Sequence, residues 1–204
     1  MTGPKRKQIR WLWLALTFVA GVATAMFAEE LILRMQGNRL DFSAPRIHYL
    51  TGRPLARLKN AEPVAFDIQV KLSAQQASNV VRVNTARFVI SYDLWEERFA
   101  VTRLTAPRKT VSHLTATEAE EWCLHEMSVL DVNGIAVTQP LWAHMEIRAE
   151  DERESRLFGR ENISEQGISL TSLIERLSRP PKASQPHWEL EAGPVTLEQL
   201  RRGG

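Results

Sequence analysis

Residues 63–104, PVAFDIQVKLSAQQASNVVRVNTARFVISYDLWEERFAVTRL, decide the fold of this chain. In residues 64–72, apolar side chains fall on every second position and mostly polar side chains lie between them. This period of two is typical of a β-strand with one face in the core and the other in water. The alternation returns over residues 88–94 and again from Phe99, after a polar corner at residues 96–98. We therefore predict consecutive antiparallel strands.

Other segments of the chain predict further strands and a helix that packs on this sheet. Residues 31–35 form a short apolar run before a Gly37-Asn38 turn, and residues 141–149 alternate again. Thr115 and Glu118 form a capping box, which predicts a helix over residues 117–128. The expected fold class is therefore mainly β (α+β), an antiparallel two-layer β-sandwich with one packed α-helix.

Shorter patterns give further local predictions. We expect one helical turn near residues 55–58, a basic loop over 105–113, and a hairpin at Asn133-Gly134. Near the C-terminus, a short amphipathic helix is expected over 170–178 and a last strand near 188–190. Thr196 is a candidate cap for a final helical turn.

The N-terminus indicates where the protein resides. Four basic residues within positions 4–10 precede an uncharged apolar run over 11–28, and two glutamates follow it. Because basic residues resist translocation, this asymmetry predicts a cytoplasmic N-terminus and a body beyond the membrane. The run approaches the roughly 20 residues that span a bilayer as a helix. It also ends near Ala23-Thr24-Ala25, a pattern that signal peptidases cleave.

Residues 1–28 are therefore either a retained signal anchor, that is, a transmembrane helix, or a cleaved signal peptide. The anchor predicts a bacterial inner-membrane protein with a periplasmic domain, and the cleaved peptide predicts secretion to the periplasm. A buried helix in a soluble protein would leave the charge asymmetry unexplained, and no cysteine follows the run to make a lipoprotein. After this leader we expect the β domain over 29–150 and a C-terminal extension over 151–204.

The composition argues against nucleic-acid binding and against an intramolecular disulfide. The chain of 204 residues has a formal charge of +2, but four of its 26 basic residues precede the apolar run. The remaining 22 face 24 acidic residues, so the folded part lacks the positive charge that nucleic-acid binding usually requires. Cys123 is the single cysteine, which excludes an intramolecular disulfide.

Candidate catalytic groups do not combine into a reactive set. The five histidines are scattered, without the tight local pairing of metal ligands. Cys123 falls on the core face of the predicted helix, where a small buried hydrophobe is the expected role. We find no phosphate-binding glycine loop, nucleophile elbow or dinucleotide fingerprint. We therefore predict no catalytic residues, no cofactor and no metal, and expect that the protein is not an enzyme.

Tryptophans give the best candidate surface. Trp95 and Trp142 fall on the otherwise polar phase of their strands, and His144 and Glu146 share a strand face with Trp142. These tryptophans either cover a second sheet layer or form an exposed interaction patch. The predicted interaction surface consists of Trp95, Trp142, His144 and Glu146.

The order of these patterns resembles a family of bacterial envelope proteins known only as a domain of unknown function. The resemblance rests on VAFDIQVKL at 64–72, RFVISYD at 87–93, RFAV at 98–101 and the Thr-capped helix, and it covers about residues 30–150. It implies an envelope location and supplies no site residue.

Three functions remain in order of preference. The first is a non-catalytic extracytoplasmic domain that mediates protein interaction or assembly, through a sheet edge or the face carrying Trp142. The second is a carrier of a small ligand or lipid, with an apolar cavity between sheet and helix. The third is a hydrolase of an envelope substrate. Expected partners are the membrane, through residues 11–28, and an envelope protein.

Overall fold

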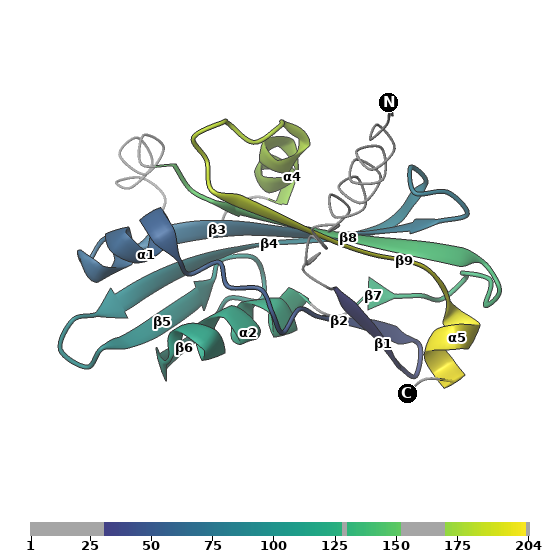
Figure 1. The fold of residues 1–204 in the computed structure, drawn as a ribbon, viewed down its shortest axis with the longest axis horizontal. Helices are drawn as coiled ribbons and strands as arrows, with labels where there is room; N and C mark the ends of the chain where they lie inside the picture. The colour runs from purple at the N-terminus through teal and green to yellow at the C-terminus, as the bar shows by residue number, and fades with distance from the viewer. Residues whose placement is uncertain (1–30, 128–129, 152–169, 203–204) are drawn as a thin grey trace, which may run out of the picture.

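A computed structural model describes residues 31–127, 130–151 and 170–202 (Figure 1). They form a mainly antiparallel β structure with two sheets and several helices, which confirms the predicted mainly β class. The strands are β1 (Ile32–Gln36), β2 (Arg39–Ser43), β3 (Val64–Ala74), β4 (Val80–Asp93), β5 (Arg98–Arg103), β6 (Lys109–Leu114), β7 (Leu130–Asp131), β8 (Pro140–Ala149) and β9 (His187–Thr196). The helices within the described residues are α1 (Gly52–Lys59), α2 (Ala116–Met127), α4 (Leu170–Ser178) and α5 (Leu197–Arg202).

The main sheet has six strands in the order β6-β5-β4-β3-β8-β9, and all neighbours are antiparallel. Its centre is β3, where Phe66 pairs with Phe88 of β4 on one side and with Ala149 of β8 on the other. The alternating apolar residues of β3 are fully buried, because they face the core. The strands predicted at 64–72, 88–94 and 141–149 are confirmed.

The predicted basic loop at residues 105–113 is partly wrong, because it contains the edge strand β6. This strand lacks a clear apolar alternation since most of its side chains are exposed. It is held by pairing to β5, where the hydroxyls of Thr102 and Thr110 lie 3.1 Å apart. An exposed edge strand therefore leaves little trace in the hydropathy pattern.

The second sheet has the order β1-β2-β7. The predicted turn at Gly37-Asn38 joins β1 to β2, with Gln36 paired to Arg39. The predicted hairpin at Asn133-Gly134 is wrong, because the strands that flank it lie in different sheets. β7 pairs with β2, whereas β8 pairs with β3 and β9.

α2 covers the inner face of the main sheet. Its N-terminus has the predicted capping box: the backbone N–H of Thr115 donates to Glu118 at 2.7 Å, and the backbone N–H of Glu118 donates to the Thr115 hydroxyl at 3.3 Å. The backbone N–H of Thr115, and then its hydroxyl, donate to the Glu118 carboxylate and lower the pKa of that carboxyl. Trp122 meets Phe88 of β4 edge to face, with ring centroids 6.0 Å apart. The helix thus packs an apolar face on the sheet.

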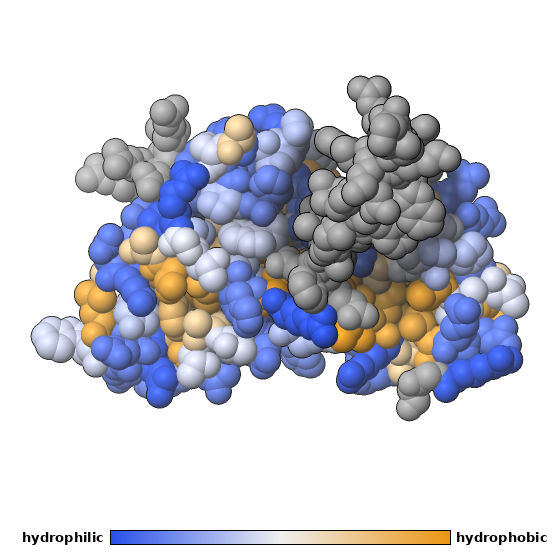
Figure 2. Space-filling view, viewed as in Figure 1, coloured by the Kyte–Doolittle hydropathy of each residue, from blue (hydrophilic) through white to orange (hydrophobic). Residues whose placement is uncertain are grey.

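The elements form layers around the main sheet (Figure 1). In that view α2, the three-stranded sheet and α5 lie on one side of the main sheet, and α4 lies on the other. Figure 2 shows mostly polar residues over α4, while apolar residues appear in the lower half of the same view, on the side of α2 and β1–β2. β9 extends the sheet beyond β8, so the C-terminal region contributes an edge strand and is not separate from the sheet.

The predicted leader at residues 1–28 and the charged stretch after residue 151 lie outside the described residues. Within the ranges that are described, no helix has both the length and the apolar character needed to cross a bilayer.

Candidate functional site

The outer face of the main sheet, opposite α2, carries polar side chains in rows that cross the strands. The register places Asp67 of β3 beside Arg87 and Arg148, and Lys71 of β3 beside His144. The row that contains Asp67 is buried where α4 packs, whereas Lys71 is partly open to solvent. Among the described residues, α4 therefore covers one half of this face and leaves the other half open.

An ionic network fills the covered half. Nη1 of Arg87 donates to both carboxylate oxygens of Asp67, at 3.2 and 3.3 Å, and its Nη2 donates to Glu150 at 2.8 Å. Arg176 of α4 approaches the same two carboxylates, at 3.7 Å from Asp67 and 4.0 Å from Glu150. Buried charges are costly unless they are paired, so this network holds α4 on the sheet.

Arg148 closes the C-terminus of α4. Its guanidinium donates to the main-chain oxygens of Arg176, Leu177 and Arg179, and its Nε donates to Glu146. The last carbonyls of a helix lack partners within the helix, and a cation there also suits the helix dipole. Glu146 is only 4% exposed. Its role in the described structure is to pair with Arg148 beneath the helix, and it does not line the open half.

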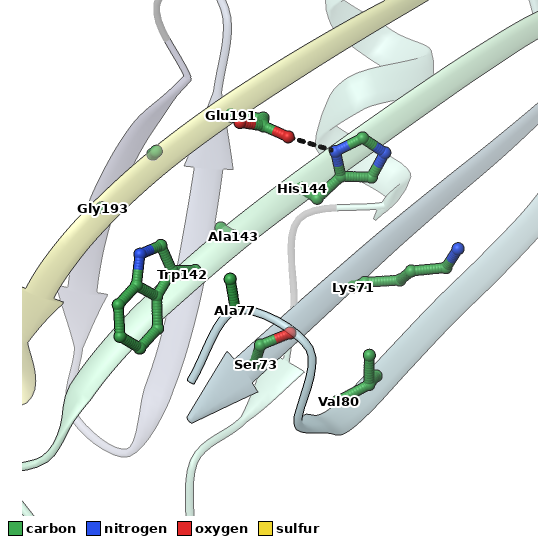
Figure 3. Close-up of a pocket in the computed structure, with 10 residues that line it drawn as sticks. Lys71, Ser73, Ala77, Val80, Trp142, Ala143, His144, Glu191 and Gly193 are labelled. Carbon is green, nitrogen blue, oxygen red and sulfur yellow. Dashed lines mark hydrogen bonds and ion pairs between the residues drawn. The ribbon is translucent and has the colours of Figure 1, made fainter. Parts of the chain in front are cut away.

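The open half contains a groove with a volume of about 300 Å³ (Figure 3). We name it the Trp142 groove. Its principal side chains come from four adjacent strands: Lys71, Ser73, Val80, Trp142, His144 and Glu191. Of the predicted surface residues, Trp142 and His144 are thus brought together. The groove joins apolar surface to one cation, one imidazole, one carboxylate and one hydroxyl.

A β-bulge places Trp142 in the groove. Leu141 pairs with Val195 and Ala143 pairs with Ala192, so Trp142 lies opposite the two residues Gly193 and Pro194. A bulge bends its strand and changes the direction of nearby side chains, and bulges are common beside functional sites. Gly193 has φ +113°, and a Cβ built on it would lie 2.4 Å from the main-chain oxygen of Leu141. The bulge therefore depends on glycine.

His144 and Glu191 are cross-strand neighbours at the other side of the groove. Nδ1 of His144 lies 3.3 Å from Oε1 of Glu191 (Figure 3). Such an exposed pair adds little stability, but its exposed polar atoms line the groove. Ser73 forms no hydrogen bond with His144 within the described structure, and a serine nucleophile needs an adjacent base.

Trp95 lies far from the groove along β4. It occupies the turn between β4 and β5, and its side chain is 95% exposed. Asp93 accepts hydrogen bonds from the backbone N–H groups of Trp95, at 2.8 Å, and Glu96, at 3.0 Å. These hydrogen bonds, from Glu96 and then Trp95, lower the pKa of the Asp93 carboxyl. The predicted surface is thus divided between two sites.

Cys123 has the predicted structural role. It is fully buried against Tyr49, and burial is the main cause that raises the pKa of its thiol to about 12. Burial, and then the neighbouring Cys123, also raise the pKa of Tyr49. Next to them, the buried Glu120 accepts a 2.6 Å hydrogen bond from the backbone N–H of Leu50 and lies 3.1 Å from His48. These contacts fix the segment before α1 to α2, and the thiol remains protonated.

Metal ligation finds no support in this part of the chain. Within residues 31–127, 130–151 and 170–202, no three His, Cys, Asp or Glu side chains gather closely enough to hold an ion.

Sequence reasoning found Trp142 and His144 and missed Lys71, Val80 and Glu191. These three come from other strands, and their proximity to Trp142 depends on strand order and register. One signal was visible: Gly193-Pro194 interrupts an alternating strand, which is typical of a bulge.

Comparison of the chain with protein-family models, with curated proteins and with solved structures found no match. The function is therefore inferred from the groove and from the exposed Trp95.

Proposed function

We propose that this protein is a non-catalytic interaction domain of the bacterial cell envelope and that it binds a protein partner through the Trp142 groove. The observation that carries the proposal is the uncovered half of the sheet face, where the bulge at Gly193 presents Trp142 beside His144. Partly exposed aromatic side chains next to polar groups are typical of protein interfaces.

The size of the groove favours side-chain recognition. A volume of about 300 Å³ is at the lower end of the range for ligand sites. It fits a group as large as one or two side chains, whereas an acyl chain needs a longer apolar cavity. A lipid carrier would have such a cavity between the main sheet and α2. At that place the rings of Phe88 and Trp122 pack edge to face instead. This packing favours interaction over lipid transport.

The envelope location is the second part of the proposal. It rests on the charge asymmetry around the apolar run at residues 11–28 and on the resemblance to envelope domains of unknown function. Residues 1–28 would deliver the β body to the periplasmic side, either as a retained anchor or as a cleaved signal.

Photocrosslinking in cells tests the proposal. A photoreactive amino acid at Val80, on the rim of the groove, should give a discrete adduct with a partner. The adduct should disappear when Trp142→Ala is added and persist with Leu170→Ala, an exposed apolar position on α4. No adduct, or adducts of equal yield in both variants, would show that the groove is not the binding surface.

A further inference from the structure

Exposed apolar side chains gather at the two ends of β4. Leu94 (52% exposed) and Trp95 follow its last residue and form what we name the Trp95 turn, residues 94–97. Val80 (45%) and Val83 (49%) lie at its first residues, beside the Trp142 groove. The other large apolar side chains that are exposed in the described structure are Val137, Leu170 and Ile174. Large exposed apolar groups that cluster in this way mark interaction surfaces.

The two surfaces cannot meet within one molecule. β4 has 14 residues, and at about 3.3 Å per residue it separates its ends by about 45 Å. Figure 1 agrees: the turn between β4 and β5 lies at the left end of the molecule, and the connection between β3 and β4 lies at the right end. Neither surface can therefore cover the other within one copy of the chain.

The Trp95 turn is held in place before any partner binds. Asp93 accepts two backbone hydrogen bonds from the turn, and Glu96 forms an ion pair of 3.1 Å with His113 of β6. Directly behind the turn, the rings of Tyr92 and Phe99 lie 4.8 Å apart. A turn whose backbone is already ordered loses less conformational freedom on docking than a flexible loop does. Trp95 therefore has the properties of an interface anchor.

The groove and the turn have complementary chemistry. Trp142 and Val80 offer apolar contact in a volume suited to one aromatic side chain and its neighbours. Lys71 forms no ion pair with any described residue, whereas Glu191 is already engaged by His144. The turn brings the carboxylates of Glu96 and Glu97 beside Trp95. A docked turn would place an aromatic ring against Trp142 and a carboxylate near Lys71.

We infer that the Trp95 turn of one copy of this chain docks in the Trp142 groove of a second copy. The inference rests on the proposed binding role of the groove and names its partner. Because the turn and the groove are different surfaces, the contact is heterologous, and it repeats from copy to copy into a ring or an open filament.

Sedimentation of the full-length chain in mild detergent tests this inference. The mass of the parent protein should rise with concentration beyond that of two copies. Trp95→Ala and Trp142→Ala should each weaken the association roughly thirtyfold or more, as expected for interface tryptophans. Leu170→Ala serves as the control and should assemble like the parent.

Mixing the two tryptophan variants gives the decisive result. Trp95→Ala keeps an intact groove and Trp142→Ala keeps an intact turn, so an equal mixture should form a dimer of one copy of each and stop there. A mixture that stays monomeric would overturn the inference, as would a parent that is monomeric at every concentration. Equal loss of assembly in Leu170→Ala would also overturn it, because it would indicate unspecific association.

A charge exchange tests the contact independently of Trp142→Ala, because misfolding of that variant would also abolish assembly. Lys71→Glu should weaken assembly, and Glu97→Lys in the same chain should restore it, with unchanged thermal unfolding. If Glu97→Lys does not restore assembly, Lys71 and Glu97 do not form the inferred contact. If the parent is monomeric while the crosslink at Val80 still captures a different protein in a Trp142-dependent way, the proposed function stands and only the self-assembly is wrong.

Discussion

The guanidinium of Arg148, on β8, donates to the main-chain oxygen of Leu177 at the end of α4 over 3.2 Å. This contact joins a sheet residue to a helix that begins only at Leu170, and it ties the end of α4 to the outer face. Arg148 belongs to the row that α4 covers, and His144 lies four residues earlier on the same strand, in the groove. The boundary between the part of the face that α4 covers and the groove thus falls within β8, between His144 and Arg148.

Arg148→Ala should destabilise the protein strongly. Removal of the guanidinium leaves the carboxylate of Glu146 buried without its partner, and loss of one member of a buried pair typically costs about 3–5 kcal/mol. The free energy of unfolding from urea titration measures this. Arg179→Ala, which removes an exposed pair with Glu175, should change it by less than about 1 kcal/mol. Equal effects of the two substitutions would mean that Arg148 does not hold the end of α4.

Sequence patterns predicted those elements whose periodicity comes from burial on one face. β3, β8 and α2 were predicted close to their observed bounds, whereas β4 begins at Val80, eight residues before the alternation predicted at 88–94. β3 also buries most of its polar face, because α4 and the ionic network cover it. β6 was missed because an exposed edge strand needs no apolar alternation. The hairpin at residues 133–134 was wrong because a turn signal fixes the local bend and does not determine which strands pair afterwards.

The site was only partly predictable for a related reason. Trp142 and His144 are neighbours on one strand, so alternation alone placed them on one face. Glu146 shares that face, yet it is buried, because α4 arrives from a distant part of the chain. Trp95 shares the polar phase but lies at the far end of β4. The alternation of residues along a strand shows which side chains share a face of the sheet. Which of them can bind a partner depends on their position along the strand and on whether another element, such as α4, covers them.

A reporter fusion should show the orientation that we propose for the N-terminus. Alkaline phosphatase joined after Glu30 should be active, because four basic residues ahead of the apolar run keep the N-terminus in the cytoplasm. A cytoplasmic reporter at the same point should be inactive. Replacing the basic residues at positions 5, 6, 7 and 10 by glutamine should reduce phosphatase activity severalfold. Activity of only the cytoplasmic reporter would contradict the envelope location.

Alkaline pH should destabilise the fold through Cys123. The thiol pKa is raised from 9.0 to about 12 in the folded protein, so the native state holds its proton more tightly than the unfolded chain. Its contribution to the free energy of unfolding is therefore complete below pH 9 and is lost as the pH rises through about 12. Tyr49 acts in the same direction.

The measurement compares the free energy of unfolding of the parent with that of Cys123→Ala as the pH rises from 8. The parent should lose more stability than the variant does, because the variant lacks the thiol. The native thiol should also resist a disulfide reagent until the protein unfolds. Rapid modification of the native protein would contradict the burial of Cys123.

Gly193→Ala should damage both stability and the groove. A positive φ of this kind costs an L-residue about 1–3 kcal/mol, and the added Cβ would lie 2.4 Å from the main-chain oxygen of Leu141. Gly134→Ala is the matched control, because Gly134 also has a positive φ, +82°, but no heavy atom lies within 4 Å of its built Cβ. Both variants should lose stability in urea titration, and Gly193→Ala should lose more, since only there must two strands move apart.

The movement of the strands would displace Trp142, so the Val80 crosslink should weaken in Gly193→Ala and persist in Gly134→Ala. If the two glycines prove equivalent in both measurements, the bulge does not position Trp142.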